Sequence, residues 1–212
     1  MQKFKPLPDC KRKEYDECRA LLILKECLGD RYLDLQLADK PDLQGDNIGV
    51  EVTTATDRNY EEGLSNWLKA QECEDENQKQ IYIERMRQLG YNYSEYAQTW
   101  NGYAPKLEMI INAIKSKTNK IQKGGYKCFP INELFIFTDV WMKDEVLLEL
   151  EKDLREKNVF SIFECIHILE KGYLLFRINN SGYEKMEIDI SEQSNRNIRA
   201  RQIVENKCEE HK

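Results

Sequence analysis

The sequence predicts an α/β protein in which helices cover both faces of a mixed β-sheet, giving a three-layer αβα sandwich. A helical pattern between Asp9 and Gly29 is followed by three short strand patterns, whose close spacing favours a meander. The segment Glu133–Thr138 has Leu-Phe-Ile-Phe at its centre, and such a continuous apolar run is typical of a strand buried on both faces. Helical patterns precede and follow this strand, so we expect a single α/β domain over residues 1–212.

The first helix is expected to have Asp9 as its N-cap and to end before Gly29. Its apolar face consists of Ala20, Leu21, Leu24 and Leu28. Glu17 lies within this face, and a carboxylate among apolar side chains needs a partner. A position near the start of a helix also suits a carboxylate through the helix dipole, so both explanations stay open. Glu14 is the second choice.

Three strands are expected after this helix. Residues 32–38 alternate between apolar and polar side chains, Pro41 begins the second strand, and residues 48–55 form the third after a turn at 44–47. Asp57 is then the expected N-cap of another helix.

The segment 71–104 is expected to be a helical insertion, since it is acidic at its start and then rich in aromatic residues. Pro105 begins the next helix, which runs to Lys123, with Lys117 at the flank of its apolar face. The remaining expected elements are a helix at 144–157, a hairpin over 161–178, a strand near 186–190 and a polar C-terminal helix.

The composition is that of an ordinary globular protein, with 41% hydrophobic residues and a net charge of −6. We find no apolar run of membrane-spanning length and no N-terminal signal segment, so we expect a cytoplasmic protein with reduced cysteines. Seven scattered cysteines without Cys-x-x-Cys spacing, and only two histidines, do not favour a zinc site.

Two acidic residues mark the candidate site. Asp42 follows Pro41, and nine residues later Glu51 is flanked by Val50 and Val52, which point to the opposite face of their strand. A buried strand rarely carries a glutamate in this position unless the charge is paired or holds a metal. Converging carboxylates provide the hard oxygen ligands that Mg²⁺ prefers.

The phrase Pro41-Asp42, followed by Ile-Gly-Val-Glu-Val-Thr at residues 48–53, resembles the PD-(D/E)XK nuclease superfamily, and uncharacterised bacterial members in particular. The resemblance covers roughly residues 10–138. It implies a restriction-endonuclease-like core and a hydrolase that cleaves phosphodiester bonds of DNA or RNA with a divalent cation.

The resemblance also implies a role for each matching residue. Asp42 and Glu51 would hold Mg²⁺ or Mn²⁺, with the Val52 carbonyl as a third ligand and Glu17 lent by the first helix. The lysine of the family motif is replaced here by Thr53, whose neutral hydroxyl supplies no positive charge.

A lysine from the helix at 105–123 has to replace the missing one if the site cleaves, and Lys117 or Lys120 is expected in that role. Six lysines and one glutamate lie between residues 106 and 127. The expected contacts to a nucleic-acid backbone are Lys115, Lys117, Lys120 and Lys123. A solvated helix face is the other explanation for this stripe. Nucleic acid is thus the expected partner, and the resemblance also allows a homodimer.

Three functions follow from these observations. The first is a metal-dependent nuclease, and the second is a nuclease-like module that binds nucleic acid or a protein without cleaving, which Thr53 favours. The third is an unrelated α/β protein, in which Asp42 and Glu51 are turn and surface residues and Glu51 faces solvent.

Overall fold

The computed structural model describes residues 9–94, 99–101, 106–125 and 127–209, which form two compact units. The smaller unit comprises residues 56–109, and the larger one comprises the described residues before and after that segment.

A seven-stranded sheet forms the centre of the larger unit, with the strand order β1-β2-β3-β6-β7-β8-β9. The strands are β1 (Gln36–Leu37), β2 (Leu43–Gln44), β3 (Ile48–Ala55), β6 (Ile131–Thr138), β7 (Cys165–Glu170), β8 (Leu174–Asn179) and β9 (Gly182–Glu187). The three central strands β3, β6 and β7 are parallel, whereas the neighbours on both sides pair antiparallel. The sheet is therefore mixed, as the sequence predicts.

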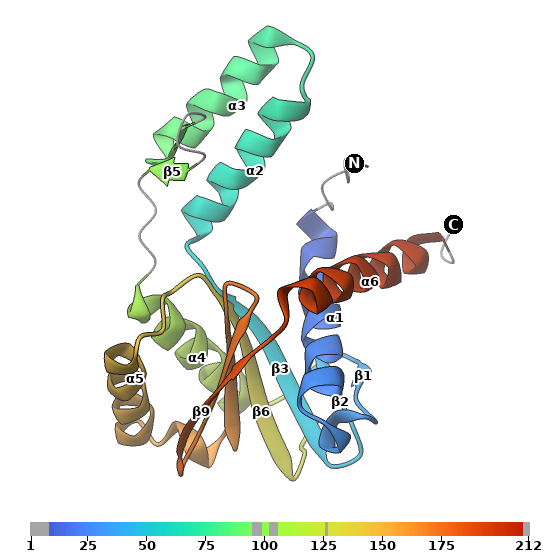
Figure 1. Cartoon of the computed structure of the whole chain (residues 1–212), viewed down its shortest axis with the longest axis vertical. Coiled ribbons are helices and arrows are strands. Elements are labelled where there is room, and N and C mark those ends of the chain that lie inside the picture. The colour runs from blue at the N-terminus through green and yellow to red at the C-terminus, as the bar shows by residue number, and fades with distance from the viewer. Residues whose placement is uncertain (1–8, 95–98, 102–105, 126, 210–212) are drawn as a thin grey trace. The chain divides into compact units, whose positions relative to one another are not determined.

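Helices cover both faces of this sheet. Figure 1 shows α1 (Asp9–Cys27) and α6 (Ile190–Glu209) on one side of it, and α4 (Leu107–Gln122) and α5 (Asp144–Glu156) on the other. The predicted three-layer αβα sandwich is confirmed.

The pleat of β3 decides which residues meet which helix layer. Val50 and Val52 belong to the apolar core that also contains Ile23 and Leu24 of α1. Glu51 therefore points to the opposite face, where Lys117 of α4 reaches it.

Most predicted elements are confirmed. The third strand has the predicted bounds, Ile48–Ala55, and Asp57 caps the helix after it by accepting a hydrogen bond from the backbone N–H of Asn59. Gly124 follows the end of α4 with φ of +82°, a conformation that favours glycine at a helix C-terminus. The predicted start at Pro105 lies outside the described residues.

The prediction of a strand over residues 32–38 is wrong for its first half. The structure has a 3₁₀ turn, η1 (Asp30–Tyr32), and the strand is limited to Gln36–Leu37. The reason is that the Tyr32 hydroxyl donates a hydrogen bond to the buried carboxylate of Glu133 at 3.0 Å, while Leu33 is left 58% exposed. The alternation of leucine with polar residues therefore predicts a longer strand here than the structure contains. Other boundaries also differ. Asp9 lies inside α1, and the predicted hairpin begins with a 3₁₀ turn, η2 (Val159–Ser161), before β7. The second strand begins at Leu43 and not at Pro41, and the strand predicted near residues 186–190 is β9, which ends at Glu187.

The smaller unit contains α2 (Arg58–Glu72), α3 (Glu76–Gln88) and a hairpin of β4 (Asn92–Ser94) and β5 (Thr99–Asn101). The Tyr91 hydroxyl donates to Asp57 at 3.1 Å, and its ring meets the Tyr60 ring edge-on. The segment 71–104, expected as an insertion, belongs to this unit, which starts earlier, at residue 56.

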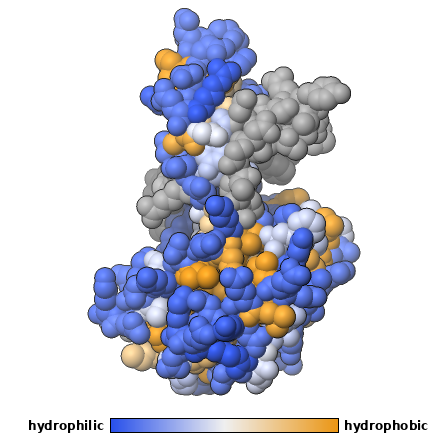
Figure 2. All heavy atoms as spheres, turned by 90° about the vertical axis from the view of Figure 1, so that its left-hand side faces the viewer, coloured by the Kyte–Doolittle hydropathy of each residue, from blue (hydrophilic) through white to orange (hydrophobic). Residues whose placement is uncertain are grey.

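Within the described part of the chain, every helix is too short or too polar to cross a membrane. Figure 2 views the side on which α5 lies in Figure 1, and shows a largely polar surface on the larger unit with an apolar patch in it.

A buried charged cluster lies on the α1 side of the sheet. His167 and Glu133 are both fully buried, and their side chains are 2.8 Å apart at Nε2 and Oε2. Arg31 contacts the second Glu133 oxygen at 2.8 Å. Burial alone would lower the pKa of His167, but the Cys165 sulfur and the Glu133 carboxylate raise this pKa to about 9.

This pair makes stability depend on pH. Because the pKa of His167 is about 9 in the folded chain against 6.5 in the unfolded chain, its stabilisation is complete below pH 6.5 and is lost as the pH rises through 9. We expect the free energy of unfolding lost on His167→Gln to be larger at pH 6 than at pH 9.5, by about 3 kcal/mol. Urea unfolding of both proteins at the two pH values measures this difference. An equal loss at both would contradict a charged His167.

Candidate metal centre

The site begins where β2 stops pairing with β3. The two strands pair at only two positions, Leu43 with Val50 and Gln44 with Gly49. Pro41 has no N–H and cannot extend the ladder, so β3 has an open edge from Glu51 onward. The Asp42 carboxylate takes the place of a strand neighbour there and accepts a hydrogen bond from the Val52 N–H at 2.8 Å.

Gly49 allows Pro41 to lie against β3. A Cβ atom at Gly49 would come within 2.6 Å of the Pro41 ring and 2.7 Å of the Phe129 ring. Neither ring can bend away as a flexible side chain does, so glycine is required here for close approach. Gly49, two residues before Glu51 in the sequence, therefore helps to hold Asp42 next to Glu51.

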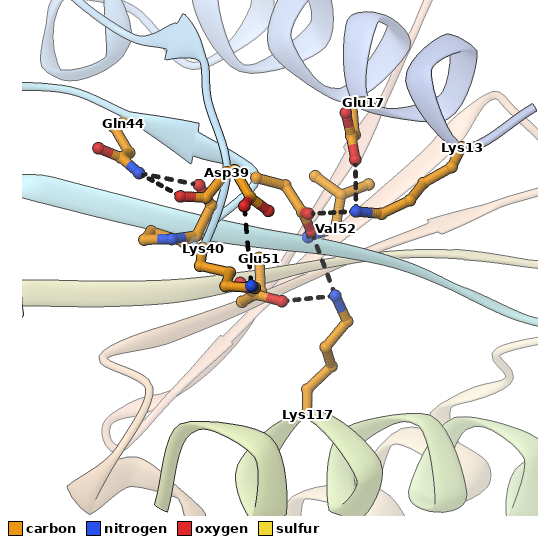
Figure 3. Close-up of polar contacts among 10 residues, drawn as sticks. Lys13, Glu17, Asp39, Lys40, Gln44, Glu51, Val52 and Lys117 are labelled. Atoms are coloured by element: carbon orange, nitrogen blue, oxygen red, sulfur yellow. Dashed lines mark hydrogen bonds and ion pairs between the residues drawn. The ribbon is translucent and has the colours of Figure 1, made fainter. Parts of the chain in front are cut away.

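Lys117 joins the two carboxylates from the opposite layer. Its ammonium group lies 2.5 Å from Glu51 Oε2 and 3.2 Å from Asp42 Oδ2. All three residues are buried, with at most 8% of their surface exposed. Figure 3 shows Lys117 extending from α4 toward the middle of β3.

Two residues of α1 complete the cluster. Lys13 contacts Asp42 Oδ1 and Glu17 Oε1, each at 3.0 Å. Figure 3 shows it reaching between Glu17 and β3. The charges therefore alternate through space in the order Glu17, Lys13, Asp42, Lys117, Glu51.

This crowding changes how the carboxyls ionise. Burial raises the pKa of Glu17 to about 7, although Lys13 opposes the change. Burial likewise raises the pKa of Glu51, against the effect of Lys117. For Asp42, burial acts in the same direction, but Lys117, the Val52 N–H and Lys13 outweigh it and lower the pKa. Burial would lower the pKa of Lys13, but its bonds to Asp42 and Glu17 raise it. Asp42 is thus the carboxylate most firmly held in its charged form.

The residues present fit a divalent cation in part. No group of three or more acidic, histidine or cysteine side chains in the described residues is arranged to hold a metal. Glu51 Oε1, however, is buried and has no hydrogen-bond partner among these residues. The N–H and carbonyl of one strand residue point to the same edge, so the Val52 carbonyl faces the edge where Asp42 lies. Two carboxylates and one carbonyl are oxygen ligands of the kind Mg²⁺ accepts together with water.

The structure places the other sequence-derived candidates differently. Thr53 is half-buried on the same face of β3 as Glu51. Lys115, Lys120 and Lys123 are exposed, so only Lys117 of the four lysines turns inward. The second-choice acid, Glu14, is ion-paired with Lys11 at 3.0 Å.

Two further findings concern the sequence-based hypotheses. Glu51 is only 2% exposed, so the hypothesis that it faces solvent is wrong. Lys13 was not identified from the sequence, although its spacing of four residues from Glu17 places both on one helix face.

Comparison with protein-family models, with curated proteins and with solved structures gave no match to this chain. The geometry of the site and the chain's own sequence are therefore the basis for any functional conclusion.

The ion pairs of Lys117 with Asp42 and Glu51 can be tested by their effect on the free energy of unfolding. Removing one partner from a buried ion pair leaves the other charge uncompensated, so we expect Lys117→Met to lower the free energy of unfolding by about 3 kcal/mol in metal-free buffer. Lys120→Met, an exposed position on the same helix, should change it by less than about 0.5 kcal/mol. Urea unfolding compares the two. Equal effects would mean that Lys117 does not hold the carboxylates.

Proposed function

We propose that the chain is a metal-dependent nuclease of the PD-(D/E)XK type, which hydrolyses phosphodiester bonds in DNA or RNA. The observation that carries this proposal is the meeting of Asp42, Glu51 and Lys117 at the open edge of β3. The three residues come from distant parts of the sequence, and Asp42 and Glu51 are those that resemble the superfamily motif.

The order of elements supports the proposal. A helix, α1, precedes the antiparallel strands β1 to β3, and after the smaller unit α4 leads to β6, which pairs parallel to β3. This arrangement agrees with the core that the resemblance implies. An α/β sandwich can host many functions, so the proposal depends on the residues of the site.

The residues of the site would have separate roles in the reaction. Asp42, Glu51 and the Val52 carbonyl would hold Mg²⁺ or Mn²⁺, with Glu17 as an added carboxylate on the α1 side. The bound cation would supply a more acidic water and offset the negative charge that develops on the phosphate. Lys117 lies within reach of both carboxylates, and its ammonium group can donate to a phosphate oxygen or to the attacking water.

Lys117 in this proposal replaces the lysine that the motif places at Thr53. A lysine at either position supplies a positive charge next to Glu51. Lys117 supplies it from helix α4, which packs on the sheet, and not from strand β3 itself. The exposed Lys115, Lys120 and Lys123 lie on the same helix and would contact the backbone of a nucleic acid. A cytoplasmic location is part of this proposal.

A nuclease-like module without catalysis is the second candidate. Two observations favour it: Thr53 replaces the motif lysine, and Lys13 and Lys117 already form ion pairs with all three carboxylates of the cluster. Such a module would bind nucleic acid in a salt-dependent way and would need no metal.

Metal titration distinguishes the two. We expect wild-type protein to bind Mn²⁺ in calorimetry, Glu51→Gln to lose binding, and Glu14→Gln, a carboxylate outside the cluster, to retain it. With a mixed-sequence oligonucleotide, Lys117→Ala should lower the cleavage rate by about a hundredfold or more, the scale expected for one removed electrostatic group.

Metal binding that is equal in the wild type and Glu51→Gln would contradict the proposed site. Salt-dependent oligonucleotide binding without Mn²⁺ binding or cleavage would favour the non-catalytic module.

A further inference from the structure

A pocket of about 270 Å³ lies beside Glu51 on the α4 side of the larger unit. The residues that line it are Pro41, Gly49, Glu51, Ile121, Gly124, Lys127, Cys128, Phe129, Asn132 and Glu133. Glu51 is thus shared between the pocket wall and the carboxylate cluster. Whatever occupies the pocket lies next to the proposed metal ligands.

The walls of the pocket are largely apolar and rigid. The rings of Pro41 and Phe129 both lie against Gly49, which has no side chain to separate them, and Phe129 is 7% exposed. Ile121, in the last turn of α4, adds a third apolar group. Flat, fixed apolar surfaces of this kind suit the face of an aromatic ring.

Polar groups lie among these surfaces. The Lys127 ammonium group lies 4.7 Å from the centre of the Phe129 ring. The Asn132 amide donates to the Phe129 carbonyl at 3.3 Å, and its side-chain oxygen has no hydrogen-bond partner among the described residues. The pocket therefore offers an apolar slot, an amide acceptor and a nearby positive charge.

We propose that this pocket holds an unpaired nucleobase of the nucleotide next to the scissile phosphate. A nucleobase has an apolar face, polar edges and an adjacent anionic phosphate, which correspond to Phe129, Asn132 and Lys127. The pocket volume of about 270 Å³ leaves room for a group larger than a single water molecule, as a nucleobase requires. The inference rests on the proposed function, because the phosphate of that nucleotide would lie near Glu51.

The consequence is a preference in substrate class. A base within a duplex is stacked and paired, so it reaches such a pocket only if it leaves the helix. The preferred substrate is therefore single-stranded nucleic acid, or a duplex with an extruded base.

Cys128 provides a test that does not depend on catalysis, because its free thiol is exposed and lines the pocket. The full chain is treated with N-ethylmaleimide in EDTA, and the alkylation of each cysteine is followed by peptide mass spectrometry. We expect deoxyadenosine monophosphate to slow alkylation of Cys128 several-fold in a saturable way, and inorganic phosphate to have no such effect. Cys73, a free cysteine of the smaller unit, serves as the internal control.

Two matched variants define the site further. Lys127→Met should weaken the protection of Cys128, whereas Lys185→Met, at an exposed lysine of β9 outside the pocket lining, should leave it unchanged. Failure of the nucleotide to protect Cys128, or equal protection by phosphate, would overturn the nucleobase pocket even if Mn²⁺ binds. Protection of Cys128 without Mn²⁺ binding at Glu51 would support the pocket and contradict the nuclease proposal.

Discussion

The Asp42 carboxylate is the group on which the arrangement of the site depends. It accepts the Val52 N–H at the open edge of β3 and contacts Lys13 on one side and Lys117 on the other. A single buried carboxylate thus connects the sheet to both helix layers. Removing a carboxylate from water costs several kcal/mol, and only well-placed partners offset that cost. The same contacts lower the pKa of Asp42, so that it stays charged.

The larger unit contains two buried charge clusters on opposite faces of one sheet. In the first, Glu133 contacts His167 and Arg31, and Glu133 and His167 are fully buried. In the second, Glu51 contacts Lys117 and lines a pocket. Each cluster has one glutamate oxygen that is buried without a hydrogen-bond partner among the described residues, so this feature does not distinguish them. The second cluster is set apart by two carboxylates and a lysine that meet at an open strand edge beside the pocket, which is an arrangement expected of a binding site.

Much of the fold could be predicted from sequence because its signals are local. The pleat of residues 48–55 and the apolar run in β6 determine strand positions without knowledge of the rest. The turn at Tyr32 could not be predicted in this way, because its cause is a hydrogen bond to Glu133, 101 residues further along the chain. In the site, too, local features could be predicted and long-range contacts could not. Glu51 was evident as a charge between two valines, but the contact of Lys13 with Asp42 depends on how α1 packs on the sheet.

The most direct test of this account is the position of a Mn²⁺ ion in crystals of the full chain, located by its anomalous scattering. The account predicts a peak bound by both Asp42 and Glu51, with the Lys117 ammonium group moved from its place between these carboxylates. The Glu51→Gln protein should show no such peak under the same conditions. An empty cluster in which Lys117 keeps both ion pairs, or Mn²⁺ bound only elsewhere, would contradict a metal-dependent site and leave the carboxylates with a structural role.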